Sequence, residues 1–249
     1  MCSTTARYSC EGRGPRSSGD RPERRLALVP AGGPVRELVL SRHALAASNR
    51  DGTCSWAPPG EGLTPEGVIQ ARGLREILAD EPIDLGVATE LARTQETLAL
   101  ALEGRDVPRL VVPELNEIHF GGFDGGPLDE YRAWAGAELP TVSAPGGGES
   151  RAAAAARFAR GLRSVLARPE DVALVVGHAL PIRYLLDAAR GLVPAARMTP
   201  VEHARPHRIA GDEAWRAVRT LEEWSADPRF RDPSVEGRAE AGAGRPLGS

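Results

Sequence analysis

The chain has 249 residues, of which 41% are hydrophobic and 26% charged, a composition that is typical of globular proteins and excludes disorder throughout. The 31 basic and 34 acidic residues give a net charge of −3 and are interspersed, so we expect no nucleic-acid partner. The three cysteines form no Cys-x-x-Cys pair and no apolar run approaches the ~20 residues of a membrane helix, so we expect a cytoplasmic protein with neither a disulfide framework nor a membrane span.

The two ends of the chain differ in composition from the middle. Residues 1–35 are rich in Arg, Ser, Gly and Pro and lack apolar periodicity, and residues 226–249 have a similar composition. Both segments are predicted to be disordered tails, because they hold too little apolar surface to bury. A single domain is therefore expected over residues 36–225.

Between the tails, short β-rich runs alternate with helical patterns. The first helix has a clear start, because Thr64 can cap it, Pro65 suits its first position and Glu66 suits the positive end of its dipole. Residues 172–177 are apolar at consecutive positions, which is typical of a strand buried on both faces of a parallel sheet. In chain order, strands are predicted at 37–41, 84–89, 109–113 and 171–177, and helices at 64–79, 91–102, 150–167 and 181–189.

This order predicts an α/β fold, a three-layer sandwich whose mostly parallel central sheet is flanked by helices. Two further runs, 205–209 and 214–219, are separated by Ala-Gly-Asp and are expected to form a terminal hairpin.

Polar residues gather where the predicted strands end. Arg42 and His43 follow the first strand, His178 follows the last, and Arg93 and Glu117 follow the two others. The carboxyl ends of parallel strands share one edge of a sheet, so we expect these side chains to form one site. Guanidinium groups bind phosphoryl oxygens through two N–H groups, imidazole can attack phosphorus, and a carboxylic acid can protonate a leaving oxygen. The residues therefore predict phosphoryl chemistry.

With these residues the chain resembles the histidine phosphatase superfamily, the phosphoglycerate-mutase-like enzymes. The resemblance extends from Leu38 to about Trp224, and several family segments occur together in the expected order and spacing. These segments are Arg42-His43, Asn49, Leu63-Thr-Pro-Glu-Gly67 with Gln70-Ala71, Arg93 with Thr97, Glu117 with Gly121, Gly147-Gly-Glu-Ser150 and His178.

The resemblance implies a metal-independent phosphomonoester hydrolase that needs no cofactor and acts on a small phosphorylated metabolite. His43 would be the nucleophile that forms a covalent phosphohistidine, and Glu117 would protonate the leaving alcohol and then deprotonate the attacking water. His178 would be the second catalytic histidine. The residues that would bind the phosphoryl group are Arg42, Arg93, His178 and Asn49.

The chain departs from the family pattern directly after the nucleophile. Ala44, Leu45 and Ala46 replace a glycine and two polar residues, so we expect a more apolar pocket for the leaving group. Residues 126–148 resemble the short cap over the site and contain one basic residue, Arg132. A mutase must bind a second, distal anion and ordinarily needs several cations for it, so transfer to water is favoured.

Four alternatives remain open. The chain could be a cofactor-dependent phosphoglycerate mutase, a protein-phosphohistidine phosphatase, or a catalytically weak phosphate-binding scaffold. A metallohydrolase with His43, His178 and Glu117 as ligands is the fourth, although the neighbouring arginines would repel a cation.

Two groups of residues also have structural interpretations. Glu149 and Ser150 are expected to end a Gly-rich loop and to satisfy the amides of the following helix. Trp56, Tyr131 and Trp134 either line the pocket or pack the cap on the body, and the sequence does not decide between these roles.

Overall fold

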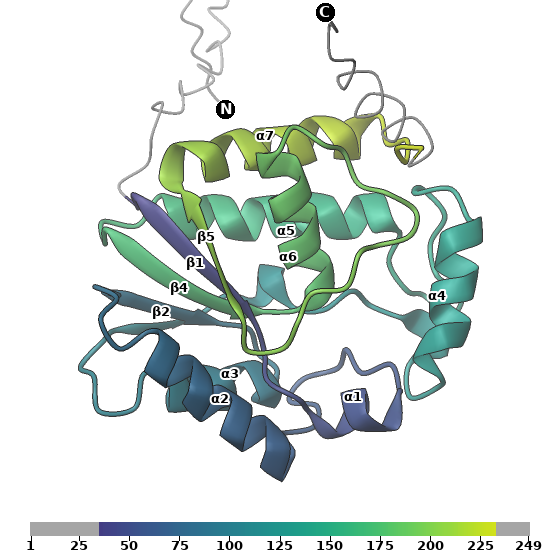
Figure 1. Ribbon diagram of the computed structural model, residues 1–249. Coiled ribbons are helices and arrows are strands. Elements are labelled where there is room, and N and C mark those ends of the chain that lie inside the picture. The colour runs from purple at the N-terminus through teal and green to yellow at the C-terminus, as the bar shows by residue number, and fades with distance from the viewer. Residues whose placement is uncertain (1–34, 233–249) are drawn as a thin grey trace, which may run out of the picture. The chain divides into compact units, whose positions relative to one another are not determined.

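The computed structural model describes residues 35–232, and their centre is a five-stranded sheet in the order β3-β2-β4-β1-β5 (Figure 1). Four strands run parallel, and β5 pairs antiparallel with β1 at one edge. The strands are β1 (Glu37–Arg42), β2 (Leu85–Ala88), β3 (Arg109–Val111), β4 (Val172–Gly177) and β5 (Pro206–Ala210). The predicted α/β class and the mostly parallel sheet are confirmed. The predicted tails cover residues 1–35 and 226–249. Residues 1–34 and 233–249 lie outside the described residues, whereas Val35 is buried and the carbonyl of Arg229 accepts a hydrogen bond from Trp224 Nε1 at 2.7 Å.

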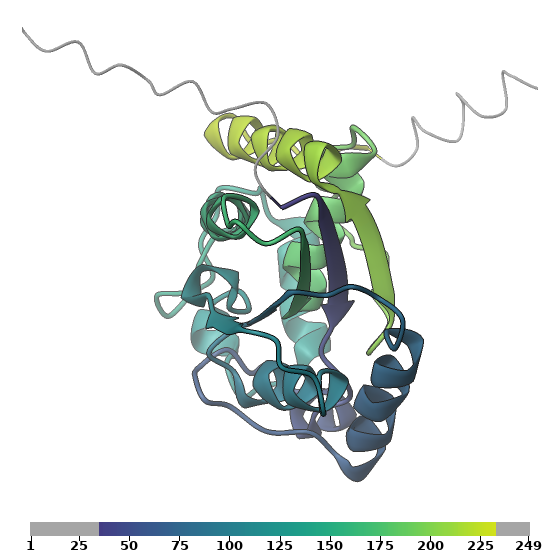
Figure 2. The ribbon, with the colours of Figure 1, turned by 90° about the vertical axis from the view of Figure 1, so that its left-hand side faces the viewer.

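Helices cover both faces of this sheet (Figures 1 and 2). Alternate residues of β1 enter opposite hydrophobic clusters: Val39 packs on the side of α2 and α3, and Leu40 packs on the side of α5, α6 and α7. Such alternation is the period of two that a strand imposes on its side chains. The helices are α1 (Ala47–Asp51), α2 (Pro65–Ile77), α3 (Ala92–Ala101), α4 (Leu128–Ala137), α5 (Arg151–Leu166), α6 (Ala179–Ala189) and α7 (Gly211–Ala226), with 3-10 turns η1 (Pro113–Leu115) and η2 (Gly121–Phe123).

The start of α2 matches its sequence signals and also fastens the loop after β1. The side chain of Thr64 accepts a hydrogen bond from the Gly67 amide at 3.0 Å, with Pro65 at the first helical position. Gly67 packs so closely that a Cβ there would lie 2.1 Å from the carbonyl oxygen of Leu45. Only glycine fits this contact without a shift of the backbone, so the sequence Thr-Pro-Glu-Gly positions the helix against the loop that follows His43.

The predicted terminal hairpin is wrong in its second half. Residues 206–210 form β5 as expected, but 214–219 lie inside the sixteen-residue helix α7. The buried residues Trp215, Val218 and Leu221 recur at helical spacing, a period that a six-residue window conceals. Gly211 begins the helix rather than a turn, and its amide donates to the carbonyl of Arg36 at 2.6 Å.

The segment 126–148 contains α4, which lies at the same end of the sheet as α1 (Figure 1). Aromatic rings join α4 to the turn η2 and the residue before it. The ring centroids of Tyr131 and Phe120 lie 4.7 Å apart in an edge-on contact, and those of Trp134 and Phe123 lie 5.4 Å apart. Tyr131 also lines the pocket described below, so it serves both of the roles that the sequence left open. Among residues 35–232, no helix combines the length and apolar character that crossing a bilayer requires.

Candidate active site

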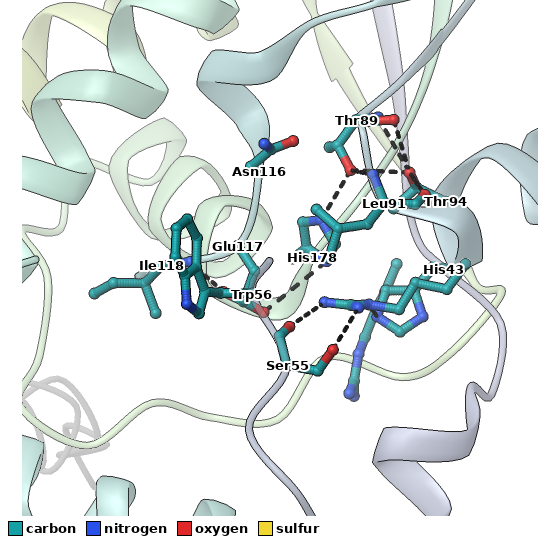
Figure 3. Close-up of polar contacts among 12 residues, drawn as sticks. His43, Ser55, Trp56, Thr89, Leu91, Thr94, Asn116, Glu117, Ile118 and His178 are labelled. Carbon is teal, nitrogen blue, oxygen red and sulfur yellow. Dashed lines mark hydrogen bonds and ion pairs between the residues drawn. The ribbon is translucent and has the colours of Figure 1, made fainter. Parts of the chain in front are cut away.

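A pocket of about 470 Å³ opens at the carboxyl ends of the parallel strands. Arg42 ends β1 and His43 follows it, Arg93 lies in the first turn of α3 after β2, and Glu117 follows η1 after β3. His178 follows β4 at the N-cap position of α6, where its side chain is fully buried next to Glu117 (Figure 3). Five residues predicted from separate strand ends are thus brought to one place.

His43 is held with one ring nitrogen free for chemistry. Its Nδ1 lies 2.8 Å from the carbonyl oxygen of Ala44, and because a carbonyl only accepts, Nδ1 carries the proton. The lone pair of Nε2 therefore faces the pocket, where Arg93 Nε donates to it at 3.2 Å. Burial lowers the pKa of His43 well below its ordinary value, and the charges of Arg93 and Arg42 lower it further. The ring is neutral at neutral pH, as a nucleophile must be.

Main-chain carbonyls orient the two arginines. Arg42 Nη1 donates to the carbonyl of Val201 at 2.9 Å, while its buried Nε has no hydrogen-bond partner among the described residues. Arg93 Nη2 donates to the carbonyl of Ser55 at 2.8 Å. Burial lowers the pKa of Arg42 to about 10, so the group stays charged at neutral pH. Both guanidinium groups are held rigidly and retain N–H groups for an anion.

His178 belongs to a buried hydrogen-bond network. Its Nε2 lies 3.1 Å from the Thr89 hydroxyl, which in turn lies 2.9 Å from the Thr94 hydroxyl (Figure 3). Its Nδ1 is buried without a hydrogen-bond partner and lies 4.0 Å from Glu117 Oε2. Burial, followed by the charges of Arg93 and His43, lowers the pKa of His178 well below its ordinary value. The ring is therefore neutral, and its contact with Glu117 is not an ion pair.

Arg157 of α5 fastens the loop that carries Glu117. Its Nη1 donates to the carbonyls of Glu114 and Asn116 at 2.9 Å each, and its Nη2 donates to the carbonyl of Glu117 at 3.2 Å. The same guanidinium pairs with Glu149 at 2.6 Å. The side chain of Glu117 is turned into the pocket and accepts from the Ile118 amide at 3.0 Å (Figure 3).

Asn49 lies on the short helix α1 and lines the pocket. Its Oδ1 accepts from the Ala46 amide at 3.3 Å, which stabilises the loop after His43. Among the described residues its Nδ2 has no hydrogen-bond partner, so the amide N–H groups are available to a ligand.

Residues 38–224 match the profile of the histidine phosphatase superfamily (branch 1), which spans most of the chain. The chain belongs to the histidine phosphatase superfamily. The family that the sequence motifs indicated is thereby confirmed.

Relatives of this chain include both phosphatases and mutases. It is 41% identical over 87 residues to the adenosylcobalamin/alpha-ribazole phosphatase of Salmonella typhimurium, an alignment that covers 35% of this chain and 43% of that protein. It is 29% identical over 203 residues to the 2,3-bisphosphoglycerate-dependent phosphoglycerate mutase 2 of Gloeobacter violaceus. This alignment covers 78% of this chain and 88% of that protein. The first alignment thus spans less than half of the relative's length.

The fold is shared with a solved structure, a putative alpha-ribazole-5'-P phosphatase from Escherichia coli K-12. The two proteins superpose with a TM-score of 0.62 at 29% identity, and the match covers 71% of this chain and 90% of the other.

The departures from the family pattern after His43 have a different consequence from the one expected. Ala44, Leu45 and Ala46 are not among the residues that line the pocket. Instead their amides are tied down, since Ala44 N donates to Thr97 Oγ1 at 3.0 Å and Leu45 N donates to Gln70 Oε1 at 2.9 Å. The three side chains therefore do not line the pocket, and main-chain amides, which do not depend on residue type, hold the loop in place.

Several residues of the site were not anticipated from the sequence. Val201 and Ser55 act through main-chain carbonyls, which residue type does not reveal. His203 forms an isolated bridge with Arg42 and donates from Nδ1 to the carbonyl of His43 at 2.7 Å. Glu149 is structural as expected, although it accepts from the His119 amide at 3.0 Å rather than from the following helix. Ser150 caps that helix by accepting from the Ala153 amide at 3.1 Å.

Proposed function

We propose that this protein is a metal-independent phosphomonoester hydrolase that works through a phosphohistidine on a small phosphorylated substrate. The observation that carries the proposal is the neutral His43 ring, whose Nε2 lone pair faces the pocket between Arg42 and Arg93. Glu117 lines the same pocket, with its Oε2 4.0 Å from His178 Nδ1, and is the carboxyl group that we assign to the leaving oxygen. The names of the phosphatase relatives agree with this chemistry.

The first half-reaction transfers the phosphoryl group to His43. The phosphate enters where Arg93 now contacts Nε2, and the charges of Arg42 and Arg93 neutralise its oxygens. Nε2 attacks phosphorus as the bond to the leaving oxygen breaks, and protonated Glu117 gives its proton to that oxygen. His178 and Asn49 donate N–H groups to the phosphoryl oxygens, and the alcohol leaves.

The second half-reaction returns the protein to its starting state. The Glu117 carboxylate takes a proton from water as that water attacks phosphorus. The bond between phosphorus and Nε2 breaks, and orthophosphate leaves with Glu117 protonated again. The arginines hold fixed positive charge at the place where other phosphatases use a pair of metal ions, so no metal ion is needed.

The decisive experiment is hydrolysis of p-nitrophenyl phosphate in EDTA by the wild type, by His43→Ala and by the matched control His207→Ala on β5. We expect turnover that survives chelation, disappears in His43→Ala and persists in the control. A phosphoprotein that is labile to acid and stable to base, absent from His43→Ala, would identify the intermediate.

Four further measurements distinguish the alternatives. Loss of turnover in EDTA with recovery on addition of a divalent metal would replace the proposal with a metallohydrolase. Vanadate binding without hydrolysis of any ester would indicate a scaffold. Transfer of the phosphoryl group to a phosphoglycerate in preference to water would indicate a mutase. Preferential dephosphorylation of a phosphohistidine peptide would indicate a protein phosphatase.

A further inference from the structure

The pocket is richer in positive charge than one phosphate requires. Arg42 and Arg93 suffice to neutralise a phosphoryl dianion, yet the pocket wall holds further arginines. Of these, Arg132 is the one basic residue of the segment 126–148 that the sequence analysis named. The others come from elements outside that segment. Arg151 reaches the pocket from α5 and Arg197 from the loop between α6 and β5.

Arg151 differs from the other two because it is buried. Its exposed fraction is 8%, whereas Arg197 is exposed and Arg132 is exposed and paired with Asp129 at 3.0 Å. Arg151 Nε donates to the Tyr184 hydroxyl at 2.6 Å. Its Nη2 is buried without a hydrogen-bond partner, and within residues 35–232 neither terminal nitrogen donates to a protein group and no carboxylate lies within 4.0 Å.

This placement is unfavourable for a cation in the absence of a ligand. Arg151 is the first residue of α5, where the helix dipole presents its positive end. Buried charges in proteins are ordinarily paired, and a buried N–H without an acceptor costs free energy. The rings of Tyr184 and Phe230 stack near the guanidinium at 5.4 and 5.6 Å, but ring stacking gives the terminal N–H groups no acceptor.

We infer that Arg151 binds a second anionic group on the substrate, so that the alcohol released by hydrolysis carries a carboxylate or a second phosphate. The inference deepens the proposed function and rests on it. An anion at this position supplies the missing acceptors, satisfies the buried charge and interacts favourably with the amino terminus of α5. Tyr131 of α4 lines the same pocket and adds a hydroxyl to its wall.

The test compares esters that differ in one charge. A series of ω-phosphoryloxy carboxylic acids with two to six carbons is measured against the matching primary amides, and alkanediol bisphosphates are measured against alkyl monophosphates of equal length. The wild type should prefer the charged member at one chain length in kcat/KM, by about ten- to a hundredfold, as expected for a hydrogen bond to a charged group. The preferred series shows whether the group is a carboxylate or a phosphate.

Variants locate the effect. Arg151→Met should remove the preference, Arg151→Lys should restore part of it, and Arg160→Met, an exposed arginine on the same helix, should leave it unchanged. Equal rates for charged and neutral esters at every length would overturn the inference, and that measurement needs only the wild type. An equal loss of preference in Arg132→Met and Arg151→Met would also overturn it, since a diffuse positive field would then be responsible.

The failure of this inference is distinct from the failure of the proposed function. If hydrolysis depends on His43 and ignores the second charge, only the inference fails. If no ester is hydrolysed, or if His43→Ala hydrolyses them all, the proposed function fails first.

Discussion

Replacing Arg157 with methionine tests how the loop of Glu117 is held in place. The methionine keeps most of the side-chain packing but removes the donors to three main-chain carbonyls and the cation that faces Glu149. The ion pair is about four-fifths buried, at 19% and 22% exposed for its two side chains. Breaking such a pair leaves a carboxylate poorly compensated, and we expect the free energy of unfolding to fall by about 3 kcal/mol.

The same variant should change activity in a way that depends on the leaving group. In the proposed mechanism Glu117 protonates the leaving oxygen, a need that is strong for an alkyl ester and weak for p-nitrophenyl phosphate, whose phenolate leaves unaided. Arg157→Met should therefore lower kcat/KM for an alkyl phosphate at least about tenfold more than for p-nitrophenyl phosphate, with Glu117→Gln showing the same pattern more strongly.

Urea unfolding and steady-state kinetics at one temperature measure both effects. Arg160→Met, exposed on the same helix, is the matched control and should alter neither stability nor the ratio between substrates. An equal loss of kcat/KM on both esters would show that Arg157 supports the fold alone and does not position Glu117. An unchanged free energy of unfolding would refute the estimate made from burial and pairing.

Three other changes have defined outcomes. Thr89→Val removes the hydroxyl that contacts His178 Nε2 and should lower kcat/KM about tenfold, with Thr89→Ser restoring it and nitrogen NMR showing the altered ring tautomer. Gly67→Ala should lower the free energy of unfolding by about 1–3 kcal/mol, because its Cβ would meet a carbonyl oxygen, while Gly73→Ala in the open part of the same helix should not destabilise the protein. Burial and a neighbouring arginine lower the pKa of His203 from 6.5 to about 4, so its contribution to stability is complete above pH 6.5 and is lost as the pH falls towards 4. A His203→Gln variant should show a flatter decline in its thermal midpoint over that range, and an identical decline would contradict the assignment.

The elements and the central chemical groups were predictable because their signals are local. The apolar run 172–177 indicates a central strand by itself, and Arg42, His43 and His178 lie at or directly after the ends of strands. Parallel pairing then brings those ends together, since a parallel sheet aligns the carboxyl ends of its strands. Short-range patterns are therefore enough to assemble this part of the site.

The remaining contacts join distant segments and leave no local signal. Arg42 is oriented by the carbonyl of Val201, and the backbone of His43 is bound by His203, about 160 residues further along the chain. In the sequence, Arg151 is indistinguishable from an exposed helical arginine, because its burial depends on contacts with distant segments. The helix α7 was mistaken for part of a hairpin because its apolar stripe needs more than six residues to show its period.

The position of β1 between β4 and β5 has a consequence for how the chain is made. The strand that carries Arg42 is synthesised early, yet both of its partners follow only after residue 171. While the ribosome completes the chain, β1 has two unpaired edges and an apolar surface, a state that favours association with other unfinished chains. Pairing over such long sequence separation also slows folding. A nascent chain that ends before β4 therefore leaves both edges of β1 unpaired and should depend on chaperones to remain dispersed.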